Sequence, residues 1–236
     1  MHSTGLKIQD SVALVTGANR GLGRALALAL RERGARTVYA GERDPGSVTD
    51  PGLVPVSLDI TDPKAVEAAA EACGEVTLLV NNAGIGRGSG LVTAPSMEAA
   101  RAEMETNFFG TLAMCRAFAP VLARNGGGAI VNVLSVLSWI TLPGAASYSA
   151  SKAAAWSMTN GVRAELREQG TSVVAVHAAF IDTDMAAHVD APKISPAEVA
   201  AQALDAVEAG EQEVLADGIS RAVASSLSQN RQGRAG

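Results

Sequence analysis

The sequence predicts a single α/β domain built on one doubly wound parallel sheet, with helices on both faces. Short apolar segments alternate with helix-forming segments along most of the 236 residues. The first apolar segment, residues 11–16, ends in a glycine-rich turn that leads directly into a helix-forming segment. Because parallel strands are joined by right-handed crossovers, this alternation predicts one sheet between two layers of helices.

The composition favours a compact enzyme and excludes several other classes of protein. Hydrophobic residues make up 47% of the chain and charged residues 18%, which argues against disorder. The net charge of −5 disfavours nucleic acid as the main partner. Cys73 and Cys115 stand apart without metal-ligand spacing, so we expect a reduced, cytoplasmic protein with no bound metal.

The length fits one domain, and neither a linker nor an internal repeat interrupts the pattern. No apolar run is long enough to cross a membrane, so we expect no membrane association. We expect residues 1–236 to form a single domain. Residues 1–8 and 225–236 are expected to be flexible ends of it.

The first predicted strand, turn and helix form a phosphate-binding arrangement. The strand covers residues 11–16, the glycine-rich turn covers residues 17–23, and the helix covers residues 24–33 and stops at Gly34. Glycines let the backbone turn tightly, and the free N–H groups at the helix start attract negative charge. The alternative is a glycine turn that serves only close packing.

The second predicted strand, residues 37–40, leads to the place where a dinucleotide fold meets the adenosine ribose. Gly41, Glu42 and Arg43 follow it. An acid at this place accepts a hydrogen bond from the ribose of NAD, whereas an arginine pairs with the 2′-phosphate of NADP. Both residue types are present, so this stretch alone does not choose between the two cofactors.

The third predicted strand, residues 53–58, ends at Asp59, which is either a ligand contact or a turn residue. Thr61 or Asp62 is expected to cap a helix over residues 63–73. A fourth strand covers residues 77–80.

Two amides and two small residues follow the fourth strand, namely Asn81, Asn82, Ala83 and Gly84. Amides at a strand end can tie neighbouring strands together or face a cofactor. The loop over residues 86–90 comes next, contains three glycines, and is expected to line an opening.

A long helix is predicted over residues 96–124, and Asn107 lies within it among apolar neighbours. A buried amide without hydrogen-bond partners costs about 1–3 kcal/mol. We therefore expect Asn107 to join a buried polar network.

The next strand, residues 129–134, ends at Ser135, and the helix after it covers residues 148–167. Tyr148 and Lys152 lie four residues apart in this helix, so both side chains project from one face. A nearby ammonium favours the phenolate and is expected to lower the pKa of Tyr148 from about 10. Tyr148 is then a candidate acid or base. The alternative is a surface tyrosine beside a solvated lysine.

The last predicted elements are a strand over residues 173–177, a helix from Ser195 to residue 209, and an edge strand over residues 213–216. His177 at the end of the first of these is expected to make a local hydrogen bond and to have no catalytic role.

These motifs resemble those of the short-chain dehydrogenases/reductases over nearly the whole chain. Residues 16–23 are similar to the family's TGxxxGxG cofactor loop, residues 81–84 to its NNAG motif, and Tyr148 with Lys152 to its YxxxK pair. The resemblance implies a Rossmann-like fold, in which residues 1–236 form a single dinucleotide-binding catalytic domain. It also implies hydride transfer between a nicotinamide cofactor and a ketone, aldehyde or secondary alcohol. The implied catalytic residues are Asn107, Ser135, Tyr148 and Lys152. The implied cofactor-binding residues are Gly17, Asn19, Arg20, Gly21, Leu22, Gly23, Arg43, Asp59, Ile60, Asn82, Ala83, Gly84, Tyr148, Lys152, Ile181 and Thr183.

The resemblance also implies a role for each catalytic residue. Tyr148 gives a proton to the substrate oxygen in reduction and removes it in oxidation, and Ser135 orients the carbonyl. Lys152 holds the nicotinamide ribose and lowers the pKa of Tyr148. Asn107 secures a water molecule in a proton relay.

The chain departs from the family pattern in three places. Ala178 and Ala179 replace the usual Pro-Gly after the sixth strand, which leaves the backbone path there open. The segment over residues 183–195 is short, so we expect an open pocket and a hydrophobic or bulky carbonyl substrate. The chain end lacks the glycine-rich sequence of many tetrameric relatives. A homodimer through the helices that hold Asn107 and Tyr148 is therefore preferred to a homotetramer.

The cofactor prediction is NADP(H). Gly41 stands where NAD-preferring relatives usually place an aspartate, and both Arg20 and Arg43 are candidates to reach a 2′-phosphate. Glu42 repels that phosphate if it points inward, so NAD(H) stays possible.

Two other functions are considered. A regulatory protein on the same fold that senses NAD(P) without turnover has no need for the complete set of four catalytic residues. A sugar epimerase or dehydratase resembles longer relatives with an added substrate domain, for which this chain has no room.

Overall fold

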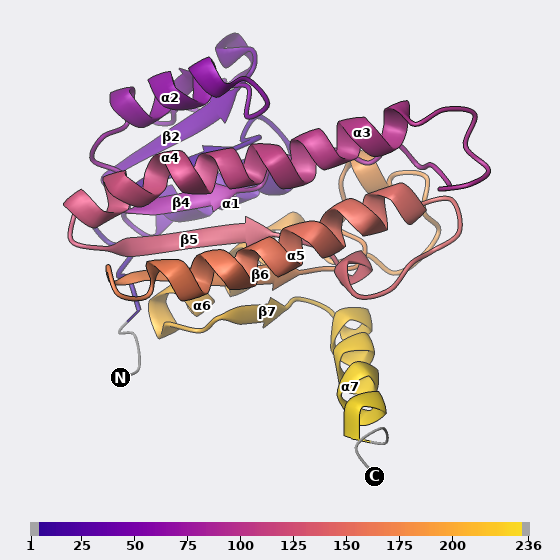
Figure 1. Cartoon of the computed structure of the whole chain (residues 1–236). Helices are drawn as coiled ribbons and strands as arrows, with labels where there is room; N and C mark the ends of the chain where they lie inside the picture. Colours follow the sequence, from indigo (N-terminus) through magenta and orange to yellow (C-terminus); the bar gives the residue numbers. More distant parts are fainter. Residues whose placement is uncertain (1–4, 233–236) are drawn as a thin grey trace.

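The structure, a computed structural model, describes residues 5–232 and confirms the predicted architecture (Figure 1). One sheet of seven parallel strands has the order β3-β2-β1-β4-β5-β6-β7. The strands are β1 (Val12–Thr16), β2 (Thr37–Glu42), β3 (Val54–Ser57), β4 (Leu78–Asn81), β5 (Gly128–Val133), β6 (Thr171–His177) and β7 (Glu213–Leu215). The winding direction reverses between β1 and β4. Sheets of this kind bind ligands at the carboxyl ends of the strands near such a reversal.

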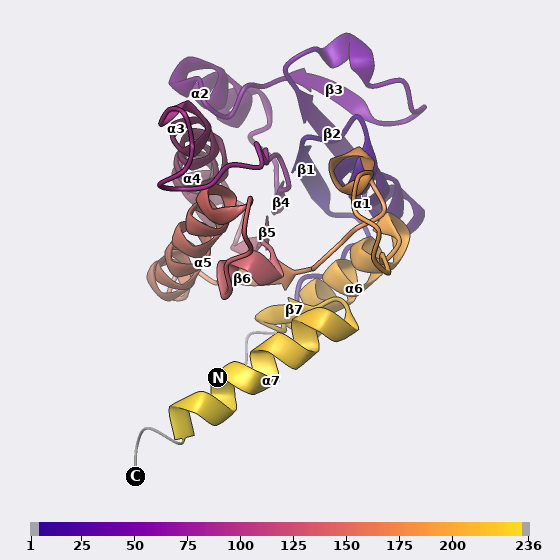
Figure 2. The ribbon, with the colours of Figure 1, turned by 90° about the vertical axis from the view of Figure 1, so that its right-hand side faces the viewer.

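Helices cover both faces of the sheet, as Figure 2 shows for the two layers. On one face lie α1 (Gly21–Glu32) and α6 (Pro196–Ala209). The other face carries α2 (Pro63–Ala72), α4 (Thr111–Arg124) and α5 (Ala146–Leu166). Within residues 5–232, none of the helices combines the length and the apolar character needed to cross a bilayer.

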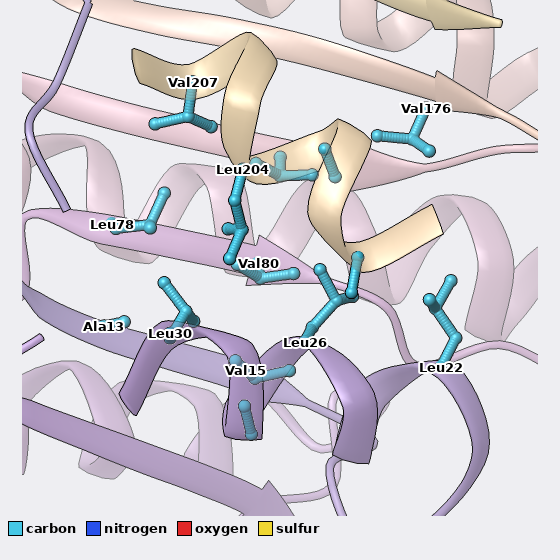
Figure 3. Packing of buried hydrophobic residues seen from close by; sticks show 14 of the residues in the cluster. Ala13, Val15, Leu22, Leu26, Leu30, Leu78, Val80, Val176, Leu204 and Val207 are labelled. Atoms are coloured by element: carbon cyan, nitrogen blue, oxygen red, sulfur yellow. The ribbon is translucent and has the colours of Figure 1, made fainter. Parts of the chain in front are cut away.

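The core on the α1 side follows from a four-residue spacing. Leu22, Leu26 and Leu30 lie on one face of α1 and are at most 6% exposed. They meet Val80 of the sheet and Leu204 of α6 (Figure 3). Truncating a fully buried leucine to alanine typically lowers the free energy of unfolding by about 2–5 kcal/mol. This packing fixes the start of α1 against the end of β1.

The predicted helix over residues 96–124 is confirmed as a continuous helical run with a wider turn inside it. The run consists of α3 (Glu98–Met104), the π-helical turn η2 (Glu105–Gly110) and α4. A methyl group added at Gly110 would lie 2.8 Å from Ile60, so glycine allows the wider turn to approach the loop after β3. Such turns within helices often mark functional sites, and this one contains Asn107.

Parts of both chain ends that were expected to be flexible form defined structure, and their flexibility stays a prediction. Ile8 is fully buried, and the Leu6 N–H donates to the Val207 carbonyl, because the N-terminal segment packs on the end of α6. At the other end, helix α7 (Gly218–Gln232) continues through most of the segment that was expected to be flexible. It projects away from the body in Figures 1 and 2. Residues 1–4 and 233–236 lie outside the described residues.

Candidate active site

The turn between β1 and α1 forms a cradle that only glycine permits. Gly17 and Gly21 adopt φ values of 67° and 53°, in the left-handed region. A methyl group added at Gly23 would lie 1.9 Å from the Gly17 carbonyl oxygen. The Asn82 side chain donates to the carbonyl oxygens of Thr16 and Gly17, at 3.0 Å each, and so ties this turn to the end of β4.

The start of α1 is free to receive an anion. Arg20 stands at the N-cap position without a side-chain cap, and the first turn of the helix contains no acidic residue. Its first N–H groups therefore lack side-chain partners, and the helix dipole favours negative charge at this end. The residues present thus fit a dinucleotide, whose diphosphate would lie against this turn. Leu22 is buried beneath it.

Charged residues of both signs lie near the expected adenosine ribose position, at the end of β2 and in the glycine turn. The Glu42 carboxylate accepts a hydrogen bond of 2.8 Å from the Asn19 N–H, so it points toward the glycine turn. Arg20 forms an exposed ion pair of 3.2 Å with Asp184, and Arg43 is exposed. A methyl group added at Gly41 would lie 2.8 Å from the Leu58 side chain, so packing also favours glycine there.

Asp59 organises the loop after β3. Its carboxylate accepts from both the N–H and the hydroxyl of Thr61, at 2.9 and 2.7 Å, and these bonds lower the pKa of Asp59. Ile60 beside it is buried. Asp62, one of the two cap residues considered, caps α2 through the Lys64 N–H. The adenine contact of Asp59 stays a prediction, because its observed bonds are those of a turn residue.

Asn107 satisfies all of its polar groups within a buried network, as predicted. Its side-chain oxygen accepts from the Ile85 N–H, and its amide group donates to the Ile85 carbonyl and to the Ser151 hydroxyl, at 2.8 to 2.9 Å. A methyl group added at Gly84 would lie 3.1 Å from the Asn107 oxygen and 3.6 Å from the Lys152 ammonium. The segment after β4, the π-helical turn and α5 therefore converge on one place.

Tyr148 and Lys152 face that place from the first turns of α5. The Lys152 Nζ donates to the Val133 carbonyl at 2.9 Å and lies 5.7 Å from the centroid of the Tyr148 ring. Lys152 is only 5% exposed, and its burial lowers the pKa of the ammonium to about 8.

The predicted downward shift of the Tyr148 pKa is wrong for this structure. Part of the residue surface stays exposed, but the surroundings of the hydroxyl are dense, and burial raises the pKa to about 12. The Ser135 hydroxyl opposes this shift, and the negative charge of Glu103 adds to it. Desolvation of the phenolate therefore outweighs any help from Lys152.

Ser135 lies behind Tyr148, at the end of β5, before the short helical turn η3 (Val136–Ser138). Its hydroxyl accepts from the Leu137 N–H at 3.1 Å and lies 3.4 Å from the Ala178 carbonyl. Its own carbonyl lies 3.2 Å from Nδ1 of His177, which confirms the local hydrogen bond expected for that histidine.

Ala178 and Ala179, which replace the usual Pro-Gly of the family, form a hydrogen-bonded turn after β6. The Ala178 carbonyl accepts from the Val136 N–H at 2.9 Å, and the Ala179 N–H donates to the Asp217 carboxylate at 2.7 Å. Farther along, a methyl group added at Gly21 would lie 3.2 Å from the Thr183 side chain. The segment that holds Ile181 and Thr183 thus reaches the glycine turn.

Sequence reasoning missed Glu103, which is fully buried on α3. Its carboxylate accepts from the Arg87 N–H at 2.6 Å, while its second oxygen has no partner among the described residues. Glu103 lies four residues before Asn107, and this spacing was the available signal that it faces the same loop.

A glycine turn joined to a Ser-Tyr-Lys cluster at the strand ends is typical of oxidoreductases that bind a dinucleotide. Residues 11–193 match the family model described as short chain dehydrogenase. The chain therefore belongs to the short-chain dehydrogenase/reductase family, as its motifs predicted.

Three similar proteins illustrate this membership. A short-chain dehydrogenase from Burkholderia cenocepacia J2315, solved in complex with NADP, is 49% identical with a TM-score of 0.93 over 97% of each chain. The 3-oxoacyl-(acyl-carrier-protein) reductase FabG of Vibrio cholerae serotype O1 is 34% identical over 190 residues, which are 76% of this chain and 77% of that protein. Dehydrogenase/reductase SDR family member 7B of Bos taurus is 32% identical over 198 residues. That match covers 75% of this chain and 60% of the bovine protein.

Proposed function

We propose that this protein is an NADP(H)-dependent reductase of ketones or aldehydes, or the corresponding dehydrogenase of secondary alcohols. The observation that carries the proposal is the convergence of three side chains near the glycine cradle, where the Ser135 hydroxyl hydrogen-bonds Tyr148 and the Lys152 Nζ lies 5.7 Å from the Tyr148 ring. A polypeptide that only senses the nucleotide has no need for a buried lysine, a serine and a tyrosine together at this place. The presence of all three residues in this protein favours catalytic turnover.

In the proposed reaction Tyr148 is the proton donor. Burial raises the pKa of its hydroxyl to about 12, so Tyr148 is protonated at neutral pH and is suited to reduction. A bound nicotinamide supplies hydride to the carbonyl carbon, which leaves negative charge on the carbonyl oxygen. Donors already aimed at that oxygen stabilise the charge without reorganisation, and we assign this role to the hydroxyls of Ser135 and Tyr148.

Lys152 and Asn107 support the reaction without donating to the substrate oxygen. The pKa of Lys152 is lowered to about 8, so this side chain still carries most of its charge at pH 7. We assign to it the ribose hydroxyls and an electrostatic stabilisation of the phenolate that forms on Tyr148. Asn107 holds Ile85, and through it the loop beside Tyr148, while its predicted water relay stays part of the proposal.

Binding of the cofactor is assigned to the residues around the glycine turn and the strand ends. We propose that the diphosphate binds at the start of α1 and that the amide-rich segment after β4 lines the adjoining ribose. The residues assigned to the cofactor are Gly17, Asn19, Arg20, Gly21, Leu22, Gly23, Arg43, Asp59, Ile60, Asn82, Ala83, Gly84, Ile181 and Thr183.

The preference for NADP(H) rests on Gly41 and on the arginines Arg20 and Arg43. It is supported by the similar Burkholderia protein, whose structure contains NADP. Glu42 opposes it, because its carboxylate faces the glycine turn. NADPH binding therefore requires this carboxylate to leave the Asn19 N–H.

Replacing Glu42 with glutamine is expected to raise the preference for NADPH over NADH about tenfold, because the repulsion of a 2′-phosphate is removed. The measurement is kcat/KM with each cofactor for the wild type and for Glu42→Gln. Glu75→Gln is the matched control. Glu75 is an exposed glutamate that contacts Tyr39, a residue of the strand that also contains Glu42. A wild type that clearly prefers NADH, with an unchanged ratio in Glu42→Gln, argues against NADP(H).

We propose a hydrophobic or bulky carbonyl substrate. Exposed apolar side chains lie on the segments that follow β4, β5 and β6. They are Leu91, Val92, Leu142 and Met185, which are 39% to 95% exposed. A substrate with an apolar body would cover them and gain about 25 cal/mol per Å² of apolar area.

The function is tested by NADPH oxidation with a panel of ketones and aldehydes that differ in size and polarity. We expect several bulky apolar carbonyls to be reduced. Strong preference for one small polar substrate contradicts the proposed substrate class. No turnover of any carbonyl, together with tight cofactor binding, favours the nucleotide-sensing alternative.

We further propose a homodimer that forms through α4 and α5. These helices border a hollow of about 560 Å³ on the outer face, lined by Phe108, Leu112 and Met158 among others. A second copy that packs on this face would bury the hollow.

A further inference from the structure

Ser135, the catalytic serine proposed above, contacts the end of β6 and the turn that follows it. The Ser135 carbonyl lies 3.2 Å from Nδ1 of His177, and the Ser135 hydroxyl lies 3.4 Å from the Ala178 carbonyl. The same Ala178 carbonyl accepts from the Val136 N–H at 2.9 Å. The position of Ser135 therefore depends on where residues 177–179 lie.

That segment is in turn held by the C-terminal part of the chain, where the Ala216 N–H donates to the His177 carbonyl at 2.9 Å and two side chains make further contacts. The Ala179 N–H donates to the Asp217 carboxylate at 2.7 Å, a hydrogen bond to a charged acceptor. Glu213 of β7 lies 3.3 Å from Nε2 of His177, and this contact lowers the pKa of Glu213. His177 is fully buried, and its ring stacks on that of Trp139 at 3.9 Å.

Asp217 also forms the start of helix α7. Its carboxylate accepts from the Ser220 N–H at 2.8 Å and from the Ser220 hydroxyl at 3.2 Å. Ser220 is fully buried, although most of α7 projects from the body. Helix α7 also lies against η3, the turn that follows Ser135 directly. One side chain thus joins the capped end of α7 to the turn beside the proposed active site.

We propose that Asp217 is a positioning residue, which couples the start of helix α7 to the Ala178–Ala179 turn and thereby fixes the catalytic Ser135. The coupling runs from Asp217 to the Ala179 N–H, and from the Ala178 carbonyl to Ser135 and Val136. The start of helix α7 then helps to position Ser135, although most of this helix projects from the body. The assignment rests on the proposed function, because it gives Ser135 a catalytic role.

The variant that tests this coupling is Asp217→Ser in the full chain. Serine is as good an N-cap residue as aspartate, so the start of α7 is preserved. Its side chain is shorter and uncharged, and it cannot serve Ala179 and Ser220 together. The matched control is Asp205→Ser, which removes an exposed aspartate of α6 that pairs with Arg33.

We expect Asp217→Ser to lower kcat for carbonyl reduction about tenfold and to leave the KM for NADPH within about twofold, because misplaced reacting groups reduce kcat. In a Ser135→Ala background the same substitution is expected to lower kcat by less than about twofold, since the two residues act as a unit. Equal losses in both backgrounds, or no loss in either, would overturn the assignment.

A readout that does not need turnover separates this inference from the proposed function. Hydrogen exchange of the amides of residues 178–183 is expected to be faster in Asp217→Ser than in the wild type, and unchanged in Asp205→Ser. Unchanged exchange in Asp217→Ser would overturn the coupling even if the enzyme is active. If the wild type reduces no carbonyl, the proposed function fails, while the exchange result still decides whether Asp217 holds the turn.

Discussion

Replacing Tyr148 with phenylalanine is expected to lower kcat/KM for carbonyl reduction about 10³-fold, with NADPH binding unchanged within about twofold. Phenylalanine keeps the ring beside Gly86 and removes only the hydroxyl that gives the proton. A positioned acid or base typically contributes about 10²- to 10⁴-fold to a rate. The measurement combines steady-state kinetics with a titration of NADPH binding.

The chain offers a matched control for this variant, because its only other tyrosine is Tyr39. The Tyr39 hydroxyl donates to Glu75 on the surface, away from the proposed site. Tyr39→Phe is therefore expected to keep full activity. If Tyr148→Phe retains more than about a tenth of the wild-type kcat/KM, Tyr148 is not the proton donor.

Reduction by the wild type is expected to lose activity as the pH rises through about 8, because Lys152 loses its charge there. Burial lowers the pKa of this ammonium to about 8, so it is charged below that pH and neutral above it. Tyr148, with its pKa raised to about 12, stays protonated over the same range and does not cause the decline. The measurement is the pH profile of kcat/KM between about pH 6 and pH 10.

Two substitutions assign this decline to the lysine. Lys152→Arg keeps the charge at every accessible pH and is expected to lose the decline near pH 8. Lys152→Met removes the charge and is expected to lower kcat/KM about 10²-fold at every pH. The control Lys64→Met, on the surface of α2, is expected to have the kcat/KM of the wild type. A wild-type profile that is flat through pH 8 shows that Lys152 does not titrate there.

The parts of the fold that depend on local chemistry could be predicted from the sequence. Residues 12–16, the glycine turn and the following helix have signals that act over a few residues, and the structure places them together as β1 and α1. Asn107 could be recognised because an amide among apolar residues must find partners, and Ile85 and Ser151 supply them. The contacts of the chain ends could not be predicted in this way, because the Leu6 N–H pairs with Val207 of α6 and the Ser220 N–H pairs with Asp217, which no local pattern indicates.

The electrostatics of the site could not be predicted from spacing alone. Tyr148 and Lys152 four residues apart indicated a lowered tyrosine pKa, but the direction is set by the packing of distant segments around the hydroxyl. The negative charge of Glu103, on another helix, adds to the rise. The contact between Asp217 and Ala179 joins positions 38 residues apart, and no pattern within either segment indicates it.

The central claim is that Tyr148 delivers a proton to the oxygen of a carbonyl that receives hydride from the nicotinamide. The most direct measurement is a crystal structure of the protein with NADP⁺ and a substrate analogue. We predict that the Tyr148 hydroxyl lies about 2.6–3.2 Å from the analogue's carbonyl or alcohol oxygen, with Ser135 on the same oxygen. A Tyr148 hydroxyl that points away from both the analogue and the nicotinamide ring would contradict the proposal.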